Sequence, residues 1–146
     1  MSHKDQIRFE TSLRILLLLE QNQGTISFTK ALCVDFIARN PTIFDIEGRT
    51  LEGTNPMVFS QFISSTNIFR SASIDLKARN LIDIQVDDND MNLTLQATGK
   101  NIAKQLTSTL AAEYRTQIKT VLNQYEDKSS EDLMKLINLS AARTNI

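Results

Sequence analysis

Few residue types in this chain could do chemistry, and none of them stands at a spacing that makes a reactive pair. Asp35 is an acid within an apolar run, where a carboxylate must either reach water at the edge of a helix or find a partner. As a catalytic group it would need a second titratable residue, and the sequence offers no evident one. Cys33 lies in the same run, which is typical of a buried and inert thiol. With one cysteine, and with His3 near the N-terminus, a zinc site is not expected.

The segment over residues 42–55 contains two glycines but does not have the pattern of a phosphate-binding loop. Glu47-Gly48-Arg49 and Glu52-Gly53-Thr54 lack the glycine spacing and the lysine of such loops. The segment is either an ordered loop or a partner-binding insertion. Because no nucleophile–base pair, metal-binding group or carboxylate dyad is readable, the sequence predicts no enzymatic activity, no metal and no cofactor.

Three cations between residues 57 and 80 could contact DNA: Arg70, Lys77 and Arg79. Against Asp75 they leave this segment with a net charge of +2. The next segment, residues 81–99, has no lysine or arginine, and four aspartates give it a charge of −4: Asp83, Asp87, Asp88 and Asp90. Neutralisation of phosphates supplies most of the affinity for DNA, so this acidic segment disfavours tight, independent DNA binding. The three cations are then either surface charges or DNA contacts that a dimer presents.

The acidic segment has the pattern of a β-hairpin. Apolar and polar residues alternate over residues 82–87 and again over 93–96, which is the period of half-buried strands. Asp88-Asn89-Asp90 between them is typical of a turn. A helix is expected on each side of the hairpin, and Thr98-Gly99 opens the second one. This layout predicts a mainly α protein with a small β-hairpin, a winged helix-turn-helix.

Four helices are expected before the hairpin. The first covers residues 2–21, with Phe9 in its core stripe, and the second covers residues 27–39. A short apolar helix over residues 57–63 and another over residues 67–80 are expected on either side of a polar break. In a helix-turn-helix these two would be the scaffold helix and the recognition helix.

One long helix is expected after the hairpin, over residues 99–125. Its apolar side chains recur every fourth residue: Ile102, Leu106, Leu110, Tyr114 and Ile118. At about 1.5 Å per residue it spans roughly 40 Å, so it is expected to pair with a long helix of a partner or of a second copy. With Met57 and Phe59, these residues form the expected partner surface. A last helix follows, so residues 1–99 form the winged-helix part and residues 100–146 a helical extension within one folding unit.

The composition is that of an ordinary soluble globular protein, with 41% hydrophobic and 23% charged residues. A net charge of −1 creates no field that favours nucleic acid or a membrane surface. The longest apolar run, residues 15–19, is far shorter than the roughly 20 residues of a membrane span, and no signal peptide is visible. A cytoplasmic protein without membrane contact is expected.

Two known groups of proteins are similar to parts of this sequence. Residues 79–82 (R-N-L-I) and 93–99 (L-T-L-Q-A-T-G) resemble the wing of MarR-like regulators, with Asn80 at the position of the usual glycine and without the arginines of that wing. A fuller resemblance, over residues 8–125, is to the small middle-component subunits of bacterial ABC-three-component systems, including the small subunit of Lamassu defence complexes. Four features carry it: the arginine-plus-leucine run 13–19, the apolar run 32–37 with Asp35, the pair Asn55-Pro56, and the wing ending in Thr98-Gly99.

The second resemblance implies a non-catalytic adaptor. Such subunits bind an SMC- or Rad50-like ATPase, and in Lamassu systems the complex also holds a nuclease or other effector and acts against phage and plasmid DNA. DNA would then be reached through the complex rather than by this chain alone. The resemblance to MarR-like regulators implies the alternative, a dimeric DNA-binding transcription regulator.

Overall fold

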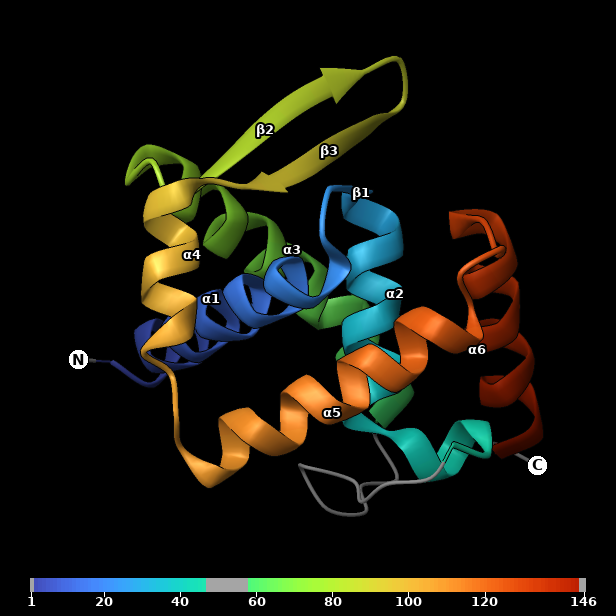
Figure 1. Cartoon of the computed structure of the whole chain (residues 1–146). Helices are drawn as coiled ribbons and strands as arrows, with labels where there is room; N and C mark the ends of the chain where they lie inside the picture. Colours follow the sequence, from blue (N-terminus) through green and yellow to red (C-terminus); the bar gives the residue numbers. More distant parts are fainter. Residues whose placement is uncertain (1, 47–57, 145–146) are drawn as a thin grey trace.

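The computed structural model describes residues 2–46 and 58–144 of the chain (Figure 1). Within these residues the chain is mainly helical with a small antiparallel sheet, as the sequence predicts. In chain order the elements are α1 (His3–Asn22), β1 (Thr25–Ser27), α2 (Phe28–Arg39), the 3-10 helix η1 (Pro41–Phe44), α3 (Val58–Ala78), β2 (Ile82–Asp87), β3 (Asp90–Leu95), α4 (Ala97–Lys104), α5 (Thr109–Gln124) and α6 (Ser130–Thr144).

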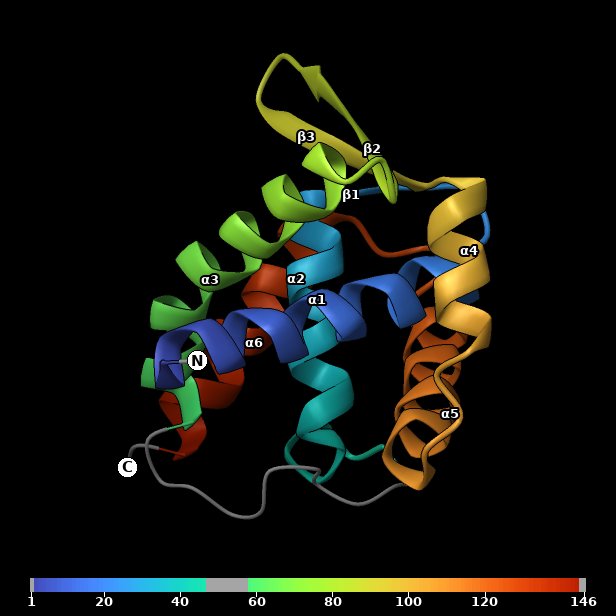
Figure 2. The same ribbon diagram turned by 90° about the vertical axis from the view of Figure 1, so that its left-hand side faces the viewer.

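Helix α2 is the central element, and α1, α3, α5, α6 and β3 all contact it (Figures 1 and 2). Every residue from Ala31 to Asn40 is buried, whichever way its side chain points. A helix that is apolar around its whole circumference is packed on all sides. Ser27 caps the helix as an acceptor from the backbone N–H of Lys30, and Asn40 and Pro41 follow its last turn. The polar side chains of α2 therefore have to find partners inside the protein.

Helix α1 is buried in its second half and exposed in its first. All residues from Ile15 to Leu19 are buried. Phe9, however, is 55% exposed, so its expected place in the core stripe is wrong. The first turns of α1 extend beyond α2 (Figure 1), and an ion pair between Arg8 and Asp75 joins them to α3. Phe9 lies in this exposed first half of the helix and remains at the surface.

The sheet has the strand order β1-β3-β2, with both pairs antiparallel. The predicted hairpin is confirmed, and its turn is Asp88-Asn89, between the paired residues Asp87 and Asp90. Strand β1 was not predicted, because three residues are too few to show an alternation. Leu93 in β3, which pairs with Ile26 of β1 and Ile84 of β2, is fully buried, whereas Val86, near the tip, is 82% exposed. The base of the hairpin therefore belongs to the core, and its tip projects from it (Figure 1).

Helix α3 is continuous, so the predicted break between residues 57–63 and 67–80 is wrong. The hydroxyls of Ser64, Ser65 and Thr66 donate to carbonyls of the preceding turn, those of Gln61 and Phe62. In this way polar residues that favour a break are accommodated within a helix. Phe62 and Phe69, on either side of the polar residues, are both buried and hold the helix on the core. The start of the predicted first helix, including Met57, lies outside the described residues.

The single helix predicted over residues 99–125 is also wrong, because α4 ends at Lys104 and α5 begins at Thr109. Ser108 caps α5 by accepting from the backbone N–H of Ala111. The guanidinium of Arg115 donates to the carbonyls of Ala103 and Leu106 and forms an ion pair with Glu20 of α1 at 2.9 Å. Arg115 thus gives carbonyl groups at the end of α4 a hydrogen-bond donor. Helix α5 folds back onto α1 and α2 instead of extending away from them (Figure 1).

The last helix, α6, packs on the central helix α2. The predicted capping box is present: Ser129 accepts from the backbone N–H of Asp132, and Asp132 accepts from that of Ser129. Leu133, Ile137 and Ser140 are buried against the rest of the chain. The C-terminal helices thus share one hydrophobic core with the elements before them.

Candidate functional site

The most polar part of the interior is a cluster around Asp35, whose side chain is 1% exposed. Arg14 of α1 places its Nε 3.0 Å from Oδ1, and Arg39 of α2 places its Nε 3.1 Å from Oδ2. The hydroxyl of Tyr114, from α5, donates to Oδ1 at 2.5 Å. Three helices are therefore joined through one carboxylate, and Asp35 has the partners that its apolar surroundings require.

The cluster holds Asp35 ionised. Burial raises the pKa of this carboxyl, but the charges of Arg14 and Arg39 and the hydrogen bonds from Tyr114 and Arg14 outweigh burial, so the pKa lies below its usual value of 3.8. Burial and the charge of Asp35 raise the pKa of Tyr114 well above 10.0, which keeps its hydroxyl a donor. Both carboxylate oxygens are occupied within the protein. This arrangement fits a structural ion cluster rather than a general acid or base.

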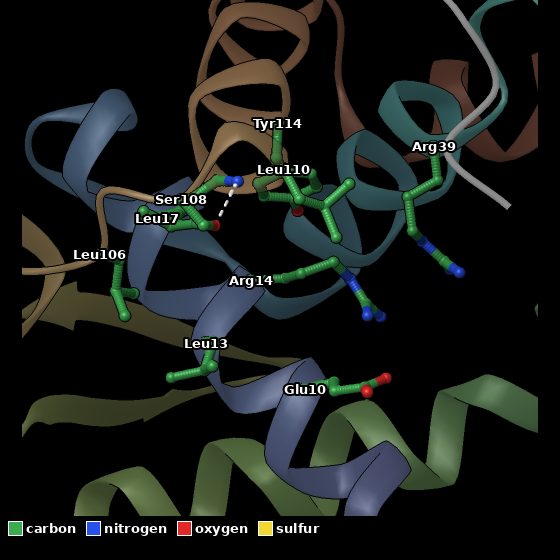
Figure 3. Close-up of a pocket in the computed structure, with 10 residues that line it drawn as sticks. Glu10, Leu13, Arg14, Leu17, Arg39, Leu106, Ser108, Leu110 and Tyr114 are labelled. Carbon is green, nitrogen blue, oxygen red and sulfur yellow. Dashed lines mark hydrogen bonds between the residues drawn. The ribbon is translucent and has the colours of Figure 1, made fainter.

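A groove lies beside the cluster, between α1 and α5 (Figure 3). It has a volume of about 360 Å³, and its walls are mainly the apolar side chains of Leu13, Leu17, Leu106 and Leu110. Figure 3 shows the guanidinium groups of Arg14 and Arg39 together at one end. Glu10 and Ser108 complete the lining, with Ala111 and Tyr114.

A second hollow, of about 280 Å³, lies on the other side of the same arginines. It shares Glu10, Arg14 and Arg39 with the first and is bounded by α3 through Gln61, Ser64, Ser65, Ile68 and Phe69. Its lining is therefore more polar than that of the groove. The two arginines line both hollows, and the groove beside α5 is the more apolar of the two.

The structure does not bring the expected partner residues together on one surface. Tyr114 and Ile118 are 2% and 0% exposed, because this face of α5 packs on α1 and α2. Their assignment to a partner surface is corrected: they belong to the core. Ile102, Leu106 and Phe59 are partly buried against the core, and Leu110 is 56% exposed. Of the α4–α5 residues in that prediction, Leu106, Leu110 and the buried Tyr114 line the groove.

The three cations predicted to contact DNA differ in their surroundings. Arg70 lies over the ring of Phe28, 5.1 Å from its centroid, and Lys77 forms an ion pair with Asp83 at 3.1 Å. Arg79 is exposed near the end of the helix. Direct DNA contact by these residues stays a prediction.

Sequence reasoning missed all three partners of Asp35, which are Arg14, Arg39 and Tyr114. A signal was present for Arg14, because an arginine within a leucine run and an aspartate within an apolar run are each costly to bury alone. Tyr114 gave no comparable signal, since its spacing fitted the apolar stripe equally well. Cys33 is buried as predicted, and burial raises the pKa of its thiol to about 12.

The described residues contain neither a metal-binding group nor a membrane-spanning helix. No group of three or more His, Cys, Asp or Glu side chains is arranged there to hold a metal ion. No helix in residues 2–46 or 58–144 is both long enough and apolar enough to cross a membrane.

Comparison with known proteins identifies a family. The family described as ABC-three component (ABC-3C) system Middle Component 2 matches residues 7–145, nearly the whole chain. No match was found among curated proteins or solved structures. The expected similarity to ABC-three-component middle components is confirmed, while the similarities to Lamassu subunits and to MarR-like wings stay predictions. The chain belongs to the Middle Component 2 family of ABC-three component systems.

Proposed function

We propose that this protein is a non-catalytic winged-helix adaptor that binds an SMC- or Rad50-like ATPase component of its own system. In the same proposal, the complex holds an effector such as a nuclease and acts in the bacterial cytoplasm against phage or plasmid DNA, as in Lamassu systems. The observation that carries the proposal is the family match over residues 7–145, because a middle component of a multi-protein system has protein partners.

The order of the elements supports the winged-helix part of the proposal. Residues 3–95 run α1, β1, α2, α3, β2, β3, and the short strand β1 pairs with β3 of the hairpin. In this interpretation α3 occupies the place of a recognition helix and the hairpin is the wing. Residues 100–146 are then the helical extension, of which α5 packs on α1 and α2 and α6 packs on α2.

The charges of the wing favour a protein partner over DNA phosphates. Asp87 and Asp88 are exposed near the tip of the hairpin, beside the apolar Val86. Lys77, the α3 cation that contacts the hairpin, is already paired with Asp83. A phosphate backbone would meet negative charge here, whereas a protein surface with basic and apolar side chains would complement it.

Co-expression with the ATPase component encoded beside this chain tests the proposal. We expect the two proteins to co-purify and to elute together on size-exclusion chromatography, and an unrelated ATPase carrying the same tag to retain no chain. If the neighbouring ATPase also retains none, the adaptor proposal is overturned.

The exposed cations of α3 favour one second candidate, a MarR-like dimeric regulator. It predicts a symmetric dimer that shifts its own upstream DNA in a gel at low salt, with affinity that falls steeply as salt rises. Absence of a shift at low salt would exclude this candidate.

A further inference from the structure

We propose that the groove between α1 and α5 is where a partner component docks, and that it takes an extended or helical protein segment with a large apolar side chain followed by a carboxylate. This inference rests on the proposed adaptor function and adds to it the surface and the chemistry of the occupant.

The apolar half of the segment is selected by the walls of the groove. Its volume of about 360 Å³ falls at the small end of the roughly 300–1,000 Å³ of ligand-binding pockets, so it has room for more than one side chain. Leu110 is 56% exposed at its edge. Phe9, one helical turn before Leu13 on α1, is 55% exposed and continues the apolar row beyond the hollow.

This continuation distinguishes a protein segment from a small molecule. A small-molecule site encloses most of its ligand. Here the apolar row runs out of the hollow onto the surface at Phe9 and Leu110, so a longer occupant is needed to cover it.

The carboxylate is selected by Arg14. The Nε of Arg14 donates to Asp35 at 3.0 Å, and its Nη2 donates to Thr11 at 3.4 Å. Its Nη1 makes no hydrogen bond with any residue of 2–46 or 58–144, although the side chain, 22% exposed, lies between the two hollows. Asp35 is already shared with Arg39 and Tyr114. A carboxylate of the partner would give the remaining N–H groups of Arg14 an acceptor.

Glu10, the acidic residue at the same end of the groove, does not occupy the acceptor position beside Arg14. Glu10 is exposed, and it accepts from Gln6 at 3.4 Å rather than pairing with Arg14. The second hollow, with Thr11, Gln61 and the serines of α3, continues beyond Arg14 and offers polar groups to the following part of the segment. The docked segment is therefore expected to carry an apolar side chain, then an acidic one, then polar ones.

The test uses the full chain and the co-expressed ATPase component, with affinity measured by titration of the purified proteins. Leu110→Glu places a negative charge at the apolar edge, where Leu110 is 56% exposed and its replacement leaves the core intact. Leu139→Glu on α6 is the matched control, since Leu139 is 58% exposed and lies outside the groove. We expect about a tenfold or greater loss of affinity for Leu110→Glu, as for an anchor residue of an interface, and an unchanged affinity for Leu139→Glu.

Arg14→Lys is the second variant, because it keeps the positive charge beside Asp35 but removes the planar guanidinium. We expect weaker binding, with a melting temperature measured alongside to show that the variant is folded. Wild-type affinity in both Leu110→Glu and Arg14→Lys would overturn the docking inference and leave the adaptor function standing. If the wild-type chain does not bind the ATPase component, both the docking inference and the adaptor proposal are overturned. If the isolated chain is a dimer that Leu110→Glu dissociates, the groove holds a second copy, and the inference is wrong.

Discussion

Replacement of Asp35 by asparagine tests whether the ion cluster is what joins α1, α2 and α5. Asparagine has nearly the same shape as aspartate, so the substitution removes the charge with little change in packing. Arg14 and Arg39 would then lack their shared carboxylate, and Tyr114 would lose a charged acceptor. The guanidinium groups are only 22% and 10% exposed, so water can replace the carboxylate only in part.

Removing one partner of a buried pair costs about 3–5 kcal/mol. Because both arginines reach some water, the lower end of this range applies, about 3 kcal/mol of the roughly 5–15 kcal/mol that stabilise a typical domain. For a chain of this length, each kcal/mol corresponds to about 3–4 °C, so the melting temperature should fall by about 10 °C.

Thermal and urea unfolding followed by circular dichroism measure this effect. Asp75→Asn is the matched control, because it removes the same charge from an exposed ion pair with Arg8, and such pairs contribute about 0–1 kcal/mol. Tyr114→Phe, which deletes one hydrogen bond to the carboxylate, should fall between the two at about 2 kcal/mol. A melting temperature of Asp35→Asn equal to that of Asp75→Asn would refute the role assigned to the cluster.

Three further predictions follow from the same structure. The pKa of the Asp35 carboxyl is lower in the folded chain than its usual 3.8. The ionised carboxylate therefore stabilises the fold above pH 3.8, and this stabilisation is lost as the pH falls through the pKa of the folded state. Between about pH 6 and pH 3, the urea midpoint should fall more steeply for the wild type than for Asp35→Asn, and parallel curves would contradict this. Gly99→Ala should destabilise the protein by about 2 kcal/mol, because the added Cβ would lie 2.1 Å from the carbonyl oxygen of Leu81. Helix propensity alone predicts about 1 kcal/mol of stabilisation instead. The direction in which the urea midpoint shifts therefore shows which of the two effects is larger. Reversal of Asp87, Asp88 and Asp90 to lysine should raise non-specific DNA affinity in a filter-binding assay and make it salt-dependent, and unchanged affinity would mean that the hairpin tip is not free to approach DNA.

Features that depend on a few neighbouring residues could be predicted from the sequence. Ser27 caps α2 and Ser129 caps α6, because a side-chain oxygen within three residues of a free N–H needs no tertiary contact. The hairpin follows from its alternation and its turn residues. Asn80, just before the hairpin, has φ 61°, a left-handed conformation that asparagine tolerates better than most residues.

Features that depend on packing were predicted less well. Ser64, Ser65 and Thr66 favour a break locally, but burial of Phe62 and Phe69 keeps α3 continuous. The apolar stripe from Ile102 to Ile118 continues through the bend between α4 and α5, so periodicity alone could not show it. Ser108 was the local sign of a new helix, and the bonds from Arg115 to Ala103 and Leu106 make the bend stable.

The sequence by itself determined the capped starts of α2 and α6 and the hairpin with its negative charge. The tertiary structure alone decided which apolar and charged residues are inside. Because α2 is surrounded by other elements, Asp35 contacts Arg14 and Tyr114 from helices distant in the chain. For the same reason Tyr114 and Ile118 lie in the core rather than at the surface. The physical reason is that an apolar stripe shows that a face will be buried, whereas the covering element depends on how the whole chain closes around its core.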